Sequence, residues 1–217
     1  MSARCRSAAR LAAICLGLAA TAGHCEPLDQ LRQFLAQTSS ASGDFVQHSA
    51  TPAAAASGAA RAVPADSRGS FEFQRPGRFR WVYRTPYEQI IVSDGASLFL
   101  YDKDLAQVTK RPLNGTLPAS PASILFGSND FGRDFEVASD GSAQGVEWIL
   151  AKPKSKESVF ERIRIGFAGG LPVAMELRDT FGQATQLRFD HLQRNPALPA
   201  KDFSFTPPAG VDVLEDR

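Results

Sequence analysis

The sequence predicts a mainly β protein with one or two short helices. Short segments with alternating apolar and polar residues recur from Gly69 onward, and glycine-containing turns separate them. No connection has the length of a crossover between parallel strands, so the expected sheet is antiparallel, with about ten strands. This pattern is typical of a sandwich or barrel. A single sheet of this kind buries its apolar face only if it curls on itself or is covered by helices.

The segment that follows the N-terminal region predicts one helix and a first strand. Apolar residues at three- and four-residue spacing place one face of a helix over Leu28–Gln37, which starts near Pro27. Ser39 to Gly43 is expected to end it, and 44–49 resembles a first strand. Residues 51–66 are rich in Ala, Pro, Gly and Ser without apolar periodicity, which predicts a long flexible loop.

The next segment predicts two hairpins. Phe71 and Phe73 alternate with polar residues, Pro76-Gly77 suits a tight turn, and an aromatic face follows in 78–83. Asp94-Gly95, a favoured turn dipeptide, joins the expected strands 89–93 and 97–101. A further short strand is expected over 105–110.

The second half predicts one more helix and further strands. Ser120 as cap and Pro121 at the first position favour a short helix over 121–126. A turn at Asp140-Gly141 is expected to join the first two of the later strands. These strands are 135–138, 146–151, 163–167, 171–177, 185–189 and a last one beginning at Phe203 and Phe205, after an irregular or short helical stretch 196–202.

The first residues predict export. Arg4, Arg6 and Arg10 precede an apolar run from Leu11 to Ala22 that ends in an A-x-A cleavage site, as in a secretory signal peptide. The run is too short for a transmembrane helix, which needs about 20 residues. We therefore expect residues 1–22 to be removed, and 23–217 to form a single domain.

Net charge limits the possible binding partners, and the cysteine content limits the possible disulfides. Loss of three arginines reduces the 24 Lys and Arg to 21, against 23 Asp and Glu, so the mature chain is slightly acidic. Such a chain has no electrostatic footprint for nucleic acid or an anionic membrane. Cleavage after Ala22 leaves Cys25 as the one remaining thiol, which excludes an intramolecular disulfide. Lipidation of Cys25 is disfavoured because His24 precedes it.

Catalytic and metal-binding motifs are not found. The histidines are scattered, and the sequence contains no H-x-x-x-H, C-x-x-C or G-x-S-x-G motif and no phosphate-binding glycine loop. Asp102 and Asp104 lack further ligands at calcium spacing and are interpreted as turn residues. No enzyme, metal or cofactor is therefore predicted. The surplus of Phe, Trp, Leu and Ile on the sheet forms either a packed core or a cavity, and the pattern alone favours the core.

Several linked sequence motifs resemble the outer-membrane lipoprotein carrier protein family of Gram-negative bacteria. They are FQRPGRFRW at 73–81, QIIVSDG at 89–95, LFLY at 98–101, and FSFTPP at 203–208 followed by Gly210-Val211. The resemblance implies a strongly curved antiparallel sheet that forms an incomplete barrel lidded by short helices. It also implies a periplasmic chaperone that takes acylated lipoproteins from an ATP-driven complex of the inner membrane to an outer-membrane receptor, working as a monomer without cofactors.

The resemblance also assigns residues. Arg75 corresponds to the family's arginine that holds the lid closed by bonding to backbone carbonyls, whereas the pattern alone makes it a solvated turn residue. Phe79 and Trp81 correspond to cavity aromatics, and Trp81 is equally well explained as ordinary core. Alternation adds weaker candidates for the lipid-binding cavity: Ile91, Leu98, Leu100, Ile163, Ile165, Val173, Met175 and Leu187. The sequence does not determine which face of the sheet is concave.

Other functions remain open at this level. A lipid-anchored outer-membrane acceptor of similar fold requires an acylated N-terminal cysteine, and Cys25 has a poor context for it. A periplasmic lipid-sensing regulatory module on the same fold requires a second domain, for which the chain is short. An enzyme of the cell envelope requires a catalytic group that the motifs do not reveal.

Overall fold

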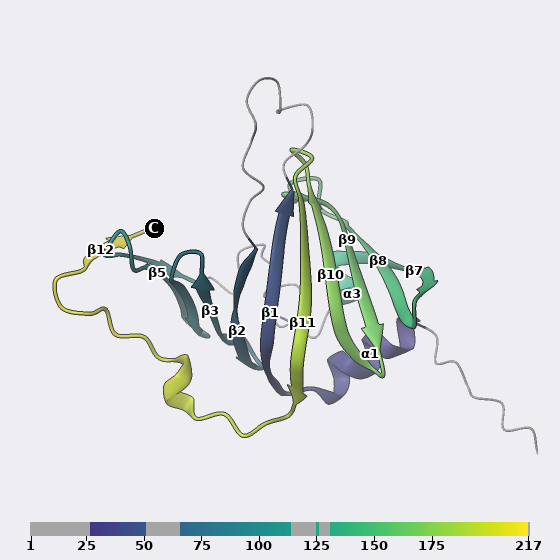
Figure 1. Ribbon diagram of the computed structural model, residues 1–217, viewed down its shortest axis with the longest axis horizontal. Helices are drawn as coiled ribbons and strands as arrows, with labels where there is room; N and C mark the ends of the chain where they lie inside the picture. Colours follow the sequence, from purple (N-terminus) through teal and green to yellow (C-terminus); the bar gives the residue numbers. More distant parts are fainter. Residues whose placement is uncertain (1–26, 51–65, 114–124, 126–130, 217) are drawn as a thin grey trace, which may run out of the picture.

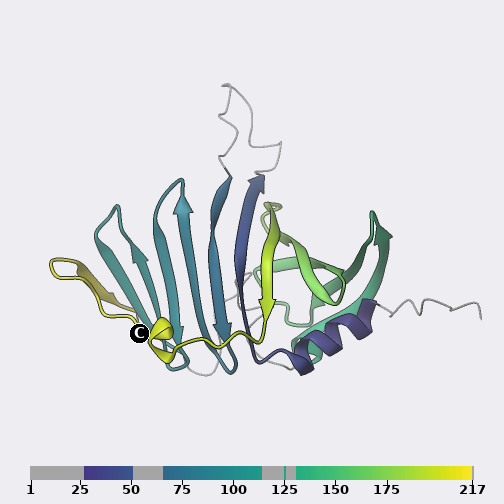
Figure 2. The same cartoon turned by 60° about the horizontal axis from the view of Figure 1, so that its bottom comes forward.

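The computed structural model describes residues 27–50, 66–113, 125 and 131–216, which form one strongly curved sheet. Its twelve strands run in the order β12-β6-β5-β4-β3-β2-β1-β11-β10-β9-β8-β7, so β12 and β7 are open edges. Figures 1 and 2 show the sheet bending into an incomplete barrel, with α1 against the strands on the β7 side. The predicted fold class, a curved sheet with short helices, is confirmed.

The elements have these bounds in chain order: α1 (Pro27–Gln37), β1 (Ser40–Ala50), β2 (Ser67–Gln74), β3 (Arg78–Thr85), β4 (Gln89–Asp94), β5 (Ser97–Asp102), β6 (Gln107–Pro112), α3 (Phe131–Asp134), β7 (Phe135–Ala143), β8 (Val146–Pro153), β9 (Phe160–Ala168), β10 (Leu171–Asp179), β11 (Ala184–Arg194), the 3-10 helix η2 (Ala200–Phe203) and β12 (Asp212–Glu215). The expected signal peptide with Cys5, Cys15 and Cys25, the loop 51–65, and the helix 121–126 apart from Leu125 lie outside the described residues.

Helix α1 packs on the concave face of the sheet. Its apolar stripe buries Leu31, Phe34 and Leu35 against β7, β8 and β9. The ring of Phe34 meets Phe167 of β9 edge to face, with 6.0 Å between centroids. The concave face is therefore the face that carries the aromatic and aliphatic cluster.

The C-terminal segment covers the opposite, convex face. η2 packs against β3 and β4, where Arg80 Nη1 donates to the carbonyl oxygen of Asp202. Phe203 is 1% exposed, and the Phe205 ring lies 5.6 Å from that of Phe99. Since Arg80 alternates with Phe79 and Trp81 along β3, this contact assigns the two aromatic residues to the concave face.

Bulges and one close approach help to bend the sheet. The pairing of β1 with β11 shifts between Ser42 and Asp44, and that of β2 with β3 shifts at Gly69. A Cβ added at Gly69 would stand 1.8 Å from the Val82 carbonyl oxygen and 2.8 Å from the Phe45 ring. Only glycine lets the two strands and this ring approach so closely.

Strand β1 begins earlier than expected, at Ser40. The residues expected to end the helix pair instead with β2, where Ser40 lies opposite Gln74. Asn195, just after β11, fastens the junction: its Oδ1 accepts from Ser39 N at 2.8 Å, and its Nδ2 donates to Gln37 O at 2.8 Å. Contacts from the far end of the chain therefore set where α1 ends.

Several other boundaries also differ from the prediction. β6 starts at Gln107, because Leu105 lies in an exposed turn. β7 continues past Asp140-Gly141 to Ala143, and the turn to β8 is Gln144-Gly145. α3 was not predicted, since its four residues are too few for a periodic pattern.

The expected last strand at Phe203 and Phe205 is wrong. Phe203 belongs to η2, Phe205 is irregular, and the final strand is β12, paired in parallel with β6. The sheet is therefore not wholly antiparallel. The segment between β11 and β12 supplies the crossover that a parallel pair needs, by running over the convex face.

Candidate functional site: an aromatic concave face with an arginine between sheet and lid

Stacked aromatic rings form the floor of the concave face at its centre. Phe45 of β1 and Trp81 of β3 have ring centroids 4.3 Å apart, and Phe71 of β2 stacks on Trp81 at 5.4 Å. All three side chains are at most 3% exposed. Strands β1, β2 and β3 are neighbours, and alternation points these rings to one side.

The floor contains one buried polar atom. The indole Nε1 of Trp81 makes no hydrogen bond of acceptable geometry with any residue that the structure describes. It lies beside the Tyr83 hydroxyl, which donates to Gln47 Oε1 at 3.0 Å. Burial raises the pKa of Tyr83, and the neighbouring indole N–H lowers it to a smaller degree. Tyr83 is therefore a neutral donor and acceptor at physiological pH.

Arg75 joins the sheet to the helical side of the molecule. It follows β2 in the turn to β3, and its Nε donates to Thr38 O, just after α1, at 3.0 Å. Its Nη2 donates to Leu125 O at 2.9 Å, and its guanidinium lies 5.3 Å from the Phe73 ring centre. A planar fork of donors can satisfy carbonyls on separate segments at once.

The surroundings of Arg75 are largely apolar. Burial lowers the pKa of its guanidinium to about 10, which still leaves it protonated at neutral pH. The cost of burying this charge is offset by hydrogen bonds to the carbonyls. The arrangement therefore depends on the carbonyl groups of Thr38 and Leu125 staying in place.

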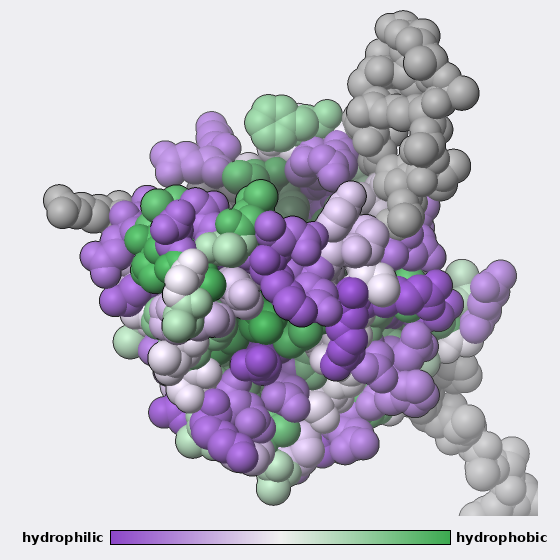
Figure 3. Space-filling view, turned by 60° about the vertical axis from the view of Figure 1, so that its left-hand side comes forward, coloured by the Kyte–Doolittle hydropathy of each residue, from purple (hydrophilic) through white to green (hydrophobic). Residues whose placement is uncertain are grey.

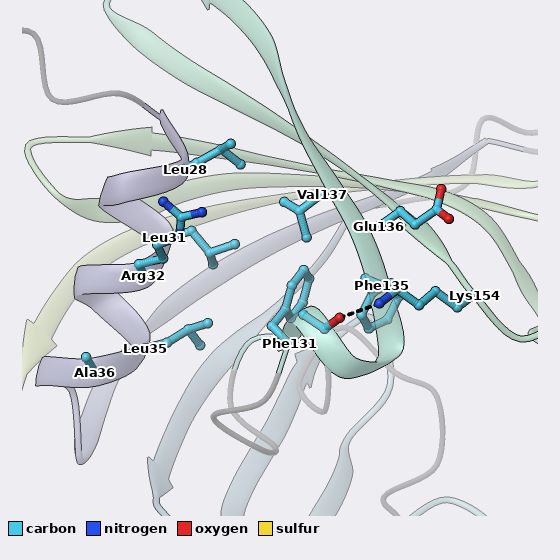
Figure 4. A pocket seen from close by; sticks show the side chains of 11 residues that line it. Leu28, Leu31, Arg32, Leu35, Ala36, Phe131, Phe135, Glu136, Val137 and Lys154 are labelled. Carbon is cyan, nitrogen blue, oxygen red and sulfur yellow. Dashed lines mark hydrogen bonds between the residues drawn. The ribbon is translucent and has the colours of Figure 1, made fainter.

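An open pocket of about 660 Å³ lies between α1, α3 and β7. In Figure 4 the side chains of Leu28, Leu31 and Leu35 point from α1 toward Phe131 and Val137. Lys154 Nζ, at the rim, donates to Gly132 O at 2.7 Å. The volume is within the range of small-molecule sites and the lining is mainly apolar, which suits a hydrocarbon chain.

The structure places most of the predicted cavity residues on the concave face. Phe79, Trp81, Ile163, Ile165, Met175 and Leu187 are buried in the apolar cluster, and Ile91 and Leu98 pack against it. Leu100 lies opposite Ile91 and shares its face, half-buried. Val173 differs, because a bulge between Pro172 and Ala174 leaves it without a partner on β9. Alternation breaks at a bulge, so it could not place Val173.

None of these predicted residues lines the open pocket. The apolar stripe of α1 was recognised in the sequence, but its partners Phe131, Phe135 and Val137 were not. Phe135 and Val137 alternate on a predicted strand, so that signal was present, whereas the short α3 gave none. Hydrophobic side chains are also visible in a recess between hydrophilic ones on the side that carries β12 and β5 (Figure 3).

Metal-binding clusters and membrane-spanning helices are absent from the described ranges. Within 27–50, 66–113, 125 and 131–216, no three His, Cys, Asp or Glu side chains gather as metal ligands would. In the same part of the chain, no helix has the length and apolar character needed to cross a membrane.

The sheet is open and curved, and its apolar concave face is partly covered by helices. This architecture places the chain in a class of β proteins that can enclose an apolar ligand. The family model described as outer membrane lipoprotein carrier protein LolA matches residues 36–206. The chain belongs to this family. The resemblance predicted from the linked motifs is confirmed.

Two relatives extend the match to most of the chain. The outer-membrane lipoprotein carrier protein of Cupriavidus pinatubonensis is 48% identical over 210 residues, covering 94% of this chain and 97% of the relative. That of Ralstonia nicotianae is 47% identical over 188 residues, with 87% and 86% covered. Among solved structures, an uncharacterized conserved protein from Thermus thermophilus has a TM-score of 0.54 at 10% identity, covering 88% and 97% of the two chains, which supports the fold alone.

Proposed function

We propose that this chain is a periplasmic chaperone that binds the acyl chains of lipoproteins released from the inner membrane and delivers them to an outer-membrane receptor. The observation that carries the proposal is near half identity, over nearly full length, to proteins named as outer-membrane lipoprotein carriers. The aromatic concave face and the apolar pocket provide matching chemistry. The role is one of binding, without catalysis.

The energetics favour a carrier of this kind. Each methylene exposed to water costs about 0.8 kcal/mol, so acyl chains do not cross an aqueous space unshielded. Transfer from a bilayer into an apolar protein interior exchanges one apolar environment for another. The net affinity then stays moderate and release remains possible.

Arg75 is the proposed latch of the lid. In the structure described here its guanidinium holds Thr38 and Leu125 on the helical side of the molecule. The aromatic floor is buried in this arrangement, so acyl chains reach it only after the groups that cover it move. Lid opening breaks these hydrogen bonds, and lid closing restores them and favours release of the cargo.

The proposal is tested with energised inner-membrane vesicles that contain lipoproteins. After incubation with ATP, the chain is expected to release lipoprotein into solution as a one-to-one complex, measured by size-exclusion chromatography and mass spectrometry. The Cupriavidus pinatubonensis relative serves as the positive control. If that relative releases lipoprotein and this chain releases none, the proposed function is wrong.

Depletion in the cell gives a complementary readout. Loss of the chain is expected to leave lipoproteins in the inner membrane instead of the outer membrane, as measured by membrane fractionation. Correct localisation after full depletion would contradict a carrier role. The inner-membrane releasing complex and the outer-membrane receptor are the partners that the proposal requires.

A substitution in the pocket beside α1 can weaken binding without disturbing the core. Ala36 is exposed and lines this pocket. Ala36→Trp is expected to fill part of it and to exclude about two methylenes of a bound chain, which lowers affinity by about tenfold. The measurement is displacement of a fluorescent hydrocarbon probe. Gln37→Trp, at the neighbouring exposed position outside the pocket lining, is the control and should bind the probe normally. If Ala36→Trp binds the probe as tightly as Gln37→Trp does, the result argues against an acyl chain in this pocket.

A further inference from the structure

The concave face changes from aromatic to polar at one end of its central strands. Directly opposed pairs there are Ser49–Thr185, Gln47–Ser67 and Tyr83–Gln89. They lie at the end of the sheet to which the β1 arrow points in Figure 1. We call this set the polar row.

The polar row lies on the same face as the aromatic floor. Phe45 precedes Gln47 by two residues on β1, and Trp81 precedes Tyr83 by two on β3, so each pair points to one side of its strand. The floor residues are buried, whereas every member of the polar row is partly exposed. The row therefore stands where the apolar interior meets water.

Hydrogen bonds connect members of the polar row to one another. Tyr83 donates to Gln47, and Gln47 Nε2 lies 3.4 Å from Ser49 Oγ. The Trp81 N–H, 3% exposed, sits at the boundary beside the Tyr83 hydroxyl, but makes no hydrogen bond of good geometry with it or with another described residue. A buried donor of this kind costs free energy unless a ligand supplies an acceptor.

The polar row consists of uncharged hydrogen-bonding side chains. Amide and hydroxyl side chains both donate and accept hydrogen bonds, and none of the six is a cation suited to phosphate. The part of an acylated protein that joins acyl chains to peptide is also uncharged, with ester and amide carbonyls and a peptide N–H. These groups lose water when the chains enter an apolar interior, and they need new partners.

We propose that the polar row, together with the Trp81 N–H, binds the ester and amide groups that link the acyl chains of the cargo to its N-terminal cysteine. This inference rests on the proposed carrier function and deepens it. The acyl chains extend over the aromatic floor, and the peptide leaves at the end of the sheet that carries the row.

The test compares two ligands on the same variants. One is a synthetic tripalmitoylated cysteinyl peptide, and the other is diphenylhexatriene, a hydrocarbon without hydrogen-bonding groups. Tyr83→Phe, Gln47→Leu and the near-isosteric Thr185→Val are each expected to weaken lipopeptide binding by about fivefold, as for loss of one hydrogen bond. Binding of the hydrocarbon should stay within about twofold of wild type, because the floor is unchanged.

Gln186→Leu is the matched control. Gln186 lies on β11 beside Leu187, opposite His48, and faces the other side of the sheet. The same change of Gln to Leu there should leave both affinities unchanged. Thermal unfolding of every variant checks that the fold is retained, and Thr185→Val keeps the test decisive if Gln47→Leu does not fold.

The outcomes separate the two hypotheses. Normal lipopeptide binding by folded row variants, or an equal loss for both ligands, overturns the assignment of the row and leaves the carrier function standing. Wild-type protein that binds the hydrocarbon but not the lipopeptide contradicts the carrier function itself.

Discussion

Arg75→Leu is expected to produce a protein that accepts lipoprotein but hands it on poorly, with transfer at least about tenfold slower. The substitution removes charge-assisted hydrogen bonds to the carbonyl oxygens of Thr38 and Leu125. Losing them destabilises the closed lid by about 3 kcal/mol, or a factor of about 100 in the closing equilibrium. Because closure favours release, the loaded open form persists. The measurement is transfer from the purified complex to receptor-containing liposomes.

Two further variants serve as controls for this prediction. Arg78→Leu removes an exposed arginine from the same hairpin, whose contact is Gln74 Oε1 at 3.4 Å, and should transfer normally. Arg75→Lys keeps the charge without the planar fork, and should fall between wild type and leucine. Normal transfer by Arg75→Leu would remove Arg75 from the functional site.

Phe45→Ala is expected to lower the free energy of unfolding by about 3–5 kcal/mol, as for other buried phenylalanines. The ring is 1% exposed, stacks on Trp81 at 4.3 Å and meets Tyr83 edge to face at 5.1 Å. Its loss leaves a hole above Gly69, where no side chain can fill the space. The measurement is urea unfolding followed by Trp fluorescence.

Phe181→Ala is the matched control for this prediction. Phe181 lies in the connection between β10 and β11 and is 86% exposed, so the same truncation should change stability by no more than about 0.5 kcal/mol. A cost below about 1 kcal/mol for Phe45→Ala would mean that the floor is loosely packed, contrary to the stacking distances.

The limits of β3, β4, β5 and β10 were predicted to within two residues, whereas β11 extends five residues beyond its predicted end. Phe71 and Phe73 on β2, and Phe79 and Trp81 on β3, indicate a half-buried strand through period-two spacing alone. Asp94-Gly95 predicts the turn between β4 and β5 from local sequence alone, and the Asp94 carboxylate accepts hydrogen bonds there from Ala96 N and Ser97 N. Short-range sterics and side-chain hydrogen bonds decide these features, so the sequence is sufficient.

Features that depend on distant partners were missed. The parallel pairing of β12 with β6 depends on the path of the segment 195–211 over the convex face. The start of β1 at Ser40 depends on Asn195, which is 155 residues away in the chain. The bulge at Val173 shifts the pairing of β10 with β9 without any sign in the alternation.

The candidate site divides in the same way. The linked motifs identified the family and singled out Arg75, but only the tertiary structure brings Arg75 to Thr38 and Leu125. The pocket between α1, α3 and β7 is likewise made by elements far apart in the chain.

By itself, the sequence determined that this is a β protein with an aromatic face on one hairpin, because strand periodicity and turn chemistry are local. Its linked motifs indicated the lipoprotein carrier family and, through that resemblance, the curvature of the sheet. The tertiary structure decided which face is concave, where the open pocket lies, and that a polar row borders the aromatic floor. These properties follow from strand register and packing, which depend on contacts between residues far apart in the sequence.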